Sequence, residues 1–309
     1  MLTFSRNELL EQPVAMKKSL IFVLLTALLA FSLLLGGCST VSLVYRNADW
    51  YLRHEINGYT SFNAQQKKLI RQDVSDYTNW HRKHALPEYI IFLQNLNGTA
   101  QYAGKLRIEN VTLLRAQLMN LYRETLAPAI SPTAKILSTL DSRQIQELDR
   151  NFAEQSQKQK DEGLETSTDE LLDKRADNTL SFVKWLTGDL SKDQEQKVRE
   201  MSRHLPAVKD IYMQNREANQ SRLIALLNNH ADEEKIAAFL STWIFTPEAT
   251  RSPQQQLAIQ SFERASDEMI VQTHGLLTAT QKEHIHKMIS SYIDDMRAEI
   301  GRSRQDSGQ

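Results

Sequence analysis

The sequence predicts an all-α protein, a bundle of about ten helices divided into two lobes. Apolar residues recur at spacings of three and four along most of the chain, as in the stripe Ile70, Val74, Tyr77, His81 and His84. This spacing is the period of a helix that buries one face. No run of alternating apolar and polar residues is long enough to indicate a strand. The chain of 309 residues contains only 10 Gly and 7 Pro, which disfavours a fold rich in tight turns.

Helix boundaries follow from these stripes, from the prolines and from polar breaks. The expected helices are 45–57, 63–85, 87–103, 109–126, 131–139, 142–185, 191–229, 232–245, 253–275 and 278–300. The stretch from Ala153 to Asp169 is polar almost all round, which indicates a solvated helix or a flexible connection. We therefore expect an N-terminal lobe at 45–150 and a C-terminal lobe at 151–300. The tail 301–309 has the composition of a disordered segment.

One signal for a helix start occurs four times: an apolar residue, a capping residue and, three positions later, a glutamine. The pairs of cap and glutamine are Asn63 and Gln66, Asp141 and Gln144, Ser191 and Gln194, and Thr278 and Gln281. In such a capping box the cap side chain accepts from the N–H of the third helical residue, whose side chain accepts from the N–H of the cap. Four ordinary helix starts are the simplest interpretation. An internal duplication or a shared surface role is the alternative.

The first 37 residues are typical of an export signal. Met16-Lys17-Lys18 precedes an apolar run from Leu20 to Leu35, which at 16 residues is short for a membrane span. Met16 is a better start for this signal than Met1. The run ends in Leu35, Gly36, Gly37 and Cys38, which resembles the lipobox of bacterial lipoproteins. A plain apolar segment that ends in this tetrapeptide by chance is the alternative.

The resemblance to a lipobox implies cleavage before Cys38 and a covalent lipid on its thiol. Three acyl chains would exceed what stable anchoring requires. Ser39, where an Asp would signal retention, resembles outer-membrane cargo of Gram-negative bacteria. We therefore expect a lipoprotein of the outer membrane that faces the periplasm, with residues 38–44 as a short tether. Beyond the covalent lipid, no cofactor is expected.

Composition excludes several classes of function. The chain carries 37 Lys and Arg against 38 Asp and Glu, so it has no basic footprint for nucleic acid. Its single cysteine rules out an internal disulfide and a zinc site made of thiolates. The sequence also contains no HExxH, GxSxG, Walker or GxGxxG motif.

Two segments could carry chemistry or binding. His81, His84 and Glu88 recur at helical spacing, so two imidazoles and a carboxylate could hold a metal ion. Pro87 disturbs that geometry, and histidines buried in the core are the commoner outcome. The segment Tyr45, Arg46, Asp49 and Trp50 follows the anchor directly. It is interpreted as aromatic packing, with a docking helix close to the membrane as the alternative.

Several blocks resemble an uncharacterised family of proteobacterial lipoproteins, a domain of unknown function. The blocks are Tyr45-Arg46-x-x-Asp49-Trp50, Trp80-His81-Arg82 with Leu86-Pro87-x-Tyr89, Trp185-Leu186-x-Gly188-x-Leu190-Ser191-x-x-Gln194, and Arg251-Ser252-Pro253. The resemblance implies an exported helical lipoprotein without an assigned reaction. Separately, Leu277-Thr278-x-x-Gln281 is similar to the Leu-Thr-x-x-Gln motif of small helical chaperones of the periplasm.

The sequence favours a non-enzymatic protein that binds envelope proteins, as an interaction or chaperone-like module. A structural role in envelope homeostasis is the first alternative. A metal-dependent hydrolase built around His81, His84 and Glu88 is the second.

Overall fold

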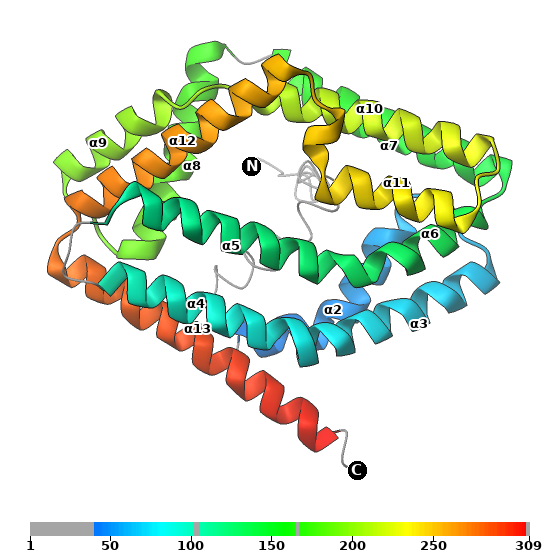
Figure 1. The fold of residues 1–309 in the computed structure, drawn as a ribbon, viewed down its shortest axis with the longest axis horizontal. Coiled ribbons are helices and arrows are strands. Elements are labelled where there is room, and N and C mark those ends of the chain that lie inside the picture. The colour runs from blue at the N-terminus through cyan, green and yellow to red at the C-terminus, as the bar shows by residue number, and fades with distance from the viewer. Residues whose placement is uncertain (1–39, 102–105, 165–166, 307–309) are drawn as a thin grey trace, which may run out of the picture. The chain divides into compact units, whose positions relative to one another are not determined.

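The structure is a computed structural model that describes residues 40–101, 106–164 and 167–306. The described residues are helical almost throughout and contain no strand, which confirms the predicted all-α fold (Figure 1). The described residues form one compact unit. No helix among the described residues is both long and apolar enough to cross a membrane.

The helices run in chain order from α2 to α13. Their bounds are α2 Thr40–Asn57, α3 Ala64–Trp80, the π-helix η1 His81–Ala85, α4 Leu86–Gln101, α5 Ile108–Leu126, the 3-10 helix η2 Ala127–Ala129, α6 Ile130–Ser138, α7 Ser142–Leu164, α8 Thr168–Thr187, α9 Lys192–Arg203, α10 Lys209–Asn228, α11 Glu233–Phe245, the 3-10 helix η3 Pro247–Thr250, α12 Pro253–Leu276 and α13 Ala279–Asp306.

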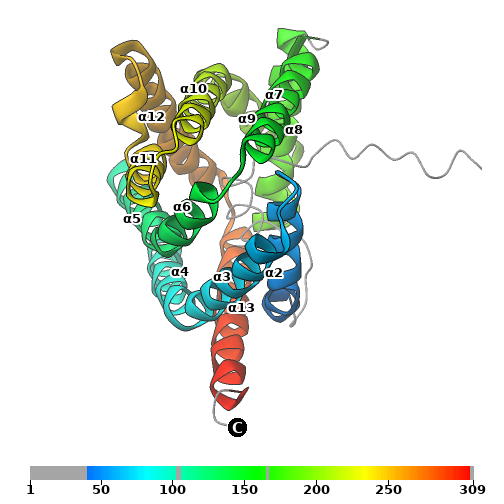
Figure 2. The ribbon, with the colours of Figure 1, turned by 90° about the vertical axis from the view of Figure 1, so that its right-hand side faces the viewer.

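Several small apolar cores hold this unit together. One lies among α6, α7, α10 and α11, around the fully buried Ile236. A second joins α2 and α4 to α13, around Leu86. The others join α3 to α6 and α8 to α9 and α12. Figure 2 shows α2 beside both α3 and α13, as its contacts with these two helices require.

These cores do not follow the expected boundary between lobes at residue 150. The core around Ile236 combines α6 and α7 with α10 and α11, and the core around Leu86 combines α2 and α4 with the C-terminal α13. The polar stretch that suggested the boundary belongs largely to α7, which packs along α10 and binds it there through Lys160 with Glu217 and Gln159 with Arg216. Two separate lobes are therefore the wrong description of residues 45–300.

Pro87 does not end a helix, contrary to the boundary expected between 85 and 87. The chain continues from α3 through η1 into α4, and the Leu86 N–H donates to the carbonyl of His81, five residues back. Proline lacks an N–H and its ring clashes with the carbonyl four residues earlier. The wider π turn accommodates that defect without a break.

Two helices expected to be continuous are each divided. The expected helix 142–185 becomes α7 and α8, because Ser167 and Glu170 form a capping box that starts α8. The expected helix 191–229 becomes α9 and α10. Pro206 disfavours a helical Leu205 before it, and the Arg175 guanidinium donates to the carbonyls of Arg203 and Leu205, at 3.0 and 2.9 Å.

The tail expected to be disordered is helical over most of its length. Helix α13 continues to Asp306, beyond the predicted end at 300. Arg302 pairs with the buried Glu299 one turn earlier, with Nη2 and Oε2 2.8 Å apart. Glycine and serine in the tail suggested disorder, whereas this pair favours continuation of the helix.

Candidate functional site

His81 is the centre of a buried polar cluster that joins α2, α3, α4 and α5. Its side chain is 3% exposed. The Tyr45 hydroxyl lies 2.6 Å from Nδ1, and the Tyr89 hydroxyl lies 3.3 Å from Nε2. The Tyr89 hydroxyl also contacts Thr125 Oγ1 at 3.0 Å, and the Tyr77 hydroxyl donates to the Thr125 carbonyl at 3.2 Å. Both ring nitrogens therefore already have hydrogen-bond partners inside the protein.

The cluster ends in an ion pair that connects it to α13. The guanidinium of Arg82 lies over the Tyr45 ring, 5.1 Å from its centroid. The Arg82 Nε is 3.0 Å from Glu299 Oε1, and the Glu299 side chain is only 8% exposed. Five helical segments thus converge on one histidine and its neighbours.

Burial keeps the imidazole and the tyrosines of this cluster uncharged at neutral pH. Desolvation, assisted by the positive charge of Arg82, lowers the pKa of His81 to about 4. Desolvation likewise raises the pKa of Tyr45 and of Tyr77. A neutral imidazole between two protonated tyrosines can donate one hydrogen bond and accept one, which suits the two contacts it makes.

The structure does not bring His81, His84 and Glu88 together. His81 is buried, whereas His84 and Glu88 are exposed. The His84 ring stacks on Trp80, with centroids 5.9 Å apart. Across the parts of the chain that the structure describes, no three or more His, Cys, Asp or Glu side chains are placed to hold a metal ion.

The four predicted capping boxes are present and meet in two pairs. At the starts of α3 and α7, the Gln66 amide donates to Gln144 Oε1 at 3.1 Å, and the Gln144 amide donates to Gln66 Oε1 at 2.7 Å. Each glutamine oxygen also accepts from the N–H of its own cap, at 2.9 Å from Asn63 and 3.0 Å from Asp141. We call this arrangement a glutamine junction.

Each amide of this first junction also donates to the chain that leads into the partner helix. The Gln66 amide reaches the Thr139 carbonyl at 3.0 Å, and the Gln144 amide reaches the Ser61 carbonyl at 2.9 Å. Gln66 and Gln144 are 2% and 1% exposed. The amide groups therefore have no hydrogen-bonding capacity left for a ligand.

The second junction joins α9 to α13 in the same way. The amides of Gln194 and Gln281 donate to each other's oxygen at 3.0 Å in both directions. The N–H groups of Ser191 and Thr278 donate to the two oxygens at 2.9 and 2.8 Å. The amides also reach the carbonyls of Leu276 and Asp189, at 2.7 and 2.8 Å.

The recurrence of this bond pattern explains why the four signals share a glutamine. An ordinary helix start needs a cap but not a glutamine that binds a second helix start. Burial excludes a shared surface role for the glutamines. An internal duplication of a pair of helix starts stays an untested alternative.

Sequence reading missed two further capping boxes and the buried carboxylate of Asp267. The boxes are Ser167 with Glu170 and Ser252 with Gln255, both of which match the capping signal. Asp267 is 2% exposed on α12, and Thr112 and Arg115 of α5 bind it, with distances of 2.8 and 3.0 Å to Oδ2. Only the spacing of Asp267 within an apolar stripe hinted at its burial.

The expected lipidation site lies outside the described residues. This applies to Leu35, Gly36, Gly37, Cys38 and Ser39, and to the export signal before them. The first described helix begins at Thr40, earlier than the predicted start at 45. The expected tether 38–44 is therefore largely the first turn of α2.

Comparison with known proteins places the chain in a family. Residues 58–250, more than half of the chain, match the model described as Family of unknown function (DUF6279). The chain belongs to this family. No curated protein and no solved structure gave a match.

The DUF6279 match begins just before α3 and ends with η3. It contains His81 and the whole first junction, Gln66 with Gln144. It contains only half of the second junction, because Gln281 lies on α13, beyond residue 250. Helices α2, α12 and α13 thus complete contacts that the DUF6279 region begins.

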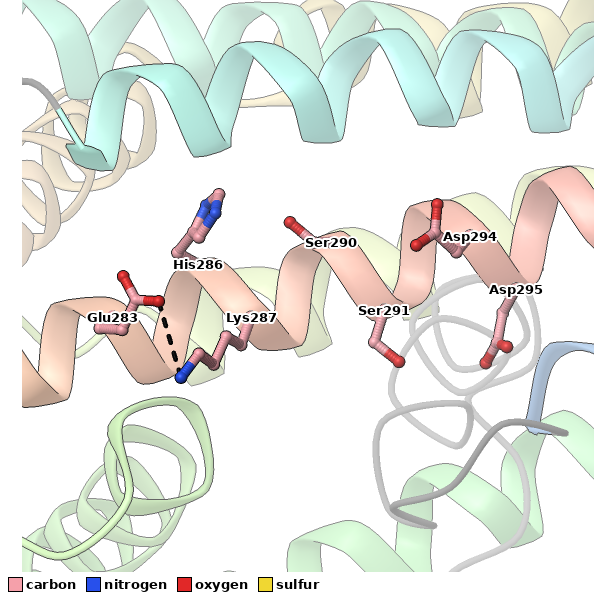
Figure 3. Close-up of a pocket in the computed structure, with 7 residues that line it drawn as sticks. All are labelled: Glu283, His286, Lys287, Ser290, Ser291, Asp294 and Asp295. Atoms are coloured by element: carbon pink, nitrogen blue, oxygen red, sulfur yellow. Dashed lines mark ion pairs between the residues drawn. The ribbon is translucent and has the colours of Figure 1, made fainter.

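One polar hollow lies along α13, outside the DUF6279 match (Figure 3). Its lining consists of Glu283, His286, Lys287, Ser290, Ser291, Asp294 and Asp295. Glu283 and Lys287 form an ion pair at 3.7 Å, drawn as a dashed line in Figure 3. Partial burial raises the pKa of Asp295, as does the charge of Asp294. All seven side chains come from one helix and do not converge on a common point (Figure 3).

Half of the large exposed apolar side chains among the described residues lie on two neighbouring helices. Helix α5 exposes Leu113, Leu118 and Met119, and α12, which packs against α5, exposes Leu257 and Ile270. Leu113 and Leu257 are 59% and 65% exposed. Large exposed apolar side chains are candidates for contact with other proteins, although single ones are common on protein surfaces.

Proposed function

We propose that this DUF6279 protein is a lipoprotein of the outer membrane that faces the periplasm and binds other envelope proteins without catalysis. The lipobox-like Leu35-Gly36-Gly37-Cys38 supports the anchor, and Ser39 supports the outer membrane. The exposed apolar side chains of α5 and α12 carry the binding half of the proposal. Their partners would be unfolded or partly folded envelope polypeptides, whose own apolar side chains are accessible.

Stability gives no reason for these five apolar residues to be exposed. Each side chain that moves from water to an apolar contact stabilises that contact by about 25 cal/mol per Å². A bound polypeptide that covered Leu113 and Leu257 would gain this energy. Two rigid neighbouring helices also avoid the entropic cost of ordering a flexible binding loop.

A defined aggregation assay tests the binding half. The lipidated protein, reconstituted in vesicles, is mixed with reduced, unfolding α-lactalbumin, and light scattering is followed. We expect the parent to delay aggregation and the double variant Leu113→Ser, Leu257→Ser to lose most of the delay. The matched control, Asn120→Ser with Gln260→Ser, changes exposed polar positions on the same helices.

Two results would contradict the binding half. One is a parent protein that leaves the aggregation of α-lactalbumin unchanged. The other is a double leucine variant that protects as well as the parent while the polar control behaves the same. Circular dichroism of all three proteins verifies that helicity is retained.

A structural role in envelope homeostasis is the second candidate. The charged hollow along α13 favours it, because a surface lined by Glu283, Lys287 and Asp294 suits a fixed polar neighbour better than an apolar client. Under this alternative the double leucine variant behaves like the parent. Charge reversal along α13, for example Asp294→Lys, would instead impair envelope integrity.

A further inference from the structure

Helix α2 has two faces, and only one of them is used by the fold. Val41, Tyr45 and Ala48 are buried on the inner face, and the first two belong to the core shared with α4 and α13. The opposite face carries exposed residues at helical spacing. They are Leu43, Arg46, Asn47, Trp50 and His54.

The exposed residues form one continuous stripe. At 3.6 residues per turn, positions 43, 46, 47, 50 and 54 fall within an arc of roughly 100°. Trp50 is 62% exposed and Leu43 is 44% exposed, and the Trp50 ring stacks on His54 with centroids 5.3 Å apart. The stripe thus combines large apolar side chains with a cationic one, Arg46, and contains no Asp or Glu.

This combination is the chemistry of a membrane interface. Tryptophan is enriched at the level of the lipid headgroups, because its ring is apolar and its N–H is polar. Amphipathic helices that lie on bilayers pair such aromatics and leucines with basic residues. The expectation that these aromatics simply pack on the bundle holds for Tyr45 but not for Trp50.

The distance to the expected anchor also points to the bilayer. Thr40, where α2 begins, is two residues after Cys38. Two extended residues span at most about 7 Å, and the three helical steps to Leu43 add about 5 Å. If Cys38 is acylated, Leu43 therefore lies within about 12 Å of a residue held at the membrane surface.

We propose that the stripe Leu43, Arg46, Asn47, Trp50 and His54 is a membrane-contacting face, which lays α2 along the lipid headgroups. The inference rests on the proposed lipidation of Cys38 and goes beyond it. An acyl anchor alone leaves the domain free to rotate above the bilayer. A contacting helix fixes which side of the bundle faces the periplasm.

Site-directed spin labelling tests this orientation. Cys38 is the only cysteine, so its lipidation leaves the thiol introduced by Leu43→Cys or Trp50→Cys as the single reactive one. The full lipidated chain is labelled with a nitroxide in vesicles of phosphatidylethanolamine and phosphatidylglycerol. Leu257→Cys is the matched control, because Leu257 is also a large exposed apolar residue, 65% exposed on α12.

We expect oxygen, which partitions into lipid, to relax the labels at 43 and 50 several-fold more strongly than a water-soluble nickel complex does. The label at 257 should show the reverse. Equal aqueous exposure at 50 and 257, in protein of the mass expected for an acylated chain, overturns the membrane face and leaves the anchor intact. Two labels per chain without acyl mass would overturn the anchor itself, and the membrane face with it.

Discussion

At the scale of single residues, His81 shows how its surroundings decide what a side chain does. An imidazole on an exposed helix could bind a metal or exchange protons near neutral pH. In this protein Tyr45 and Tyr89 occupy its two nitrogens, and burial lowers its pKa to about 4. The most distinctive histidine of the sequence is therefore a structural residue that stays neutral.

The lowered pKa of His81 makes the free energy of unfolding depend on pH. An unfolded histidine with a pKa near 6.5 binds its proton earlier than folded His81 does, so the unfolded state gains protons as the pH falls. The His81 contribution is fully present above pH 6.5 and is lost progressively between about pH 6.5 and 4. The difference in pKa corresponds to about 3 kcal/mol of stability.

Urea unfolding at pH 7 and pH 4.5 checks this prediction. His81→Gln should lower stability at pH 7 by about 1–3 kcal/mol, since a buried hydroxyl loses its partner, but should flatten the loss on acidification. His84→Ala, at an exposed position on the next turn, should keep the parent's acid sensitivity. If His81→Gln loses as much stability as the parent between pH 7 and 4.5, then groups other than His81 cause that loss.

At the scale of helices, each glutamine junction stabilises a place where the N-termini of two helices meet. Two helix starts meet in each junction, and their dipoles place like partial charges together. The capping side chains and reciprocal amides satisfy the N–H groups there, as between Gln66 and Gln144. A junction thereby fixes the distance between α3 and α7 without an apolar contact at that point.

Removal of one amide should be costly because several groups lose partners together. Gln66→Ala leaves the Asn63 N–H and the Gln144 amide without their acceptor in a buried place, with an expected loss of about 2–4 kcal/mol. Gln255→Ala is the control, because Gln255 closes a capping box at an exposed helix start. It should lose no more than about 1 kcal/mol.

A double-mutant cycle isolates the junction itself. The stabilities of Gln66→Ala, Gln144→Ala and the double variant should reveal a coupling of about 1–3 kcal/mol. Additive losses, or a Gln66→Ala variant no less stable than Gln255→Ala, would mean that the two amides act as independent caps.

The helix starts and the π turn show which features can be predicted from the sequence and which cannot. Local chemistry predicted the four capping boxes and most helix ends, because a cap and its glutamine are three residues apart. It could not predict that Gln66 contacts Gln144, since the two residues are 78 positions apart and nothing local signals that pairing. It also placed a break at Pro87, because a π turn that absorbs a proline depends on packing around His81 rather than on local propensity.

At the scale of the whole molecule, the apolar cores combine helices from before and after residue 150. They therefore do not divide into the two expected lobes. The polar run at 153–169 resembled a linker, yet residues 153–164 of it belong to α7, which packs on α10. Polar composition marks exposure of a helix, not its independence. The signal for a lipid anchor, in contrast, can be found from the sequence. Its charged start, apolar run and cysteine follow one another within residues 16–39.

Sorting between the two membranes gives a test at this scale. If the proposed location is right, Ser39→Asp should leave lipidation intact and move the protein from the outer to the inner membrane. Density-gradient fractionation with acyl-chain labelling follows both properties, and Ser39→Thr serves as the control. Unchanged sorting of Ser39→Asp would remove the outer-membrane assignment and leave the lipid anchor in place.

The most direct test of the proposed lipid anchor is the intact mass of the chain extracted from membranes. We predict a mature chain that begins at Cys38 and carries diacylglycerol and an amide-linked acyl chain. Cys38→Ser lacks the thiol that is alkylated, so it should remain an uncleaved precursor without acyl mass. A parent chain without acyl mass, or normal cleavage of Cys38→Ser, would contradict the lipid anchor on which the proposed function depends.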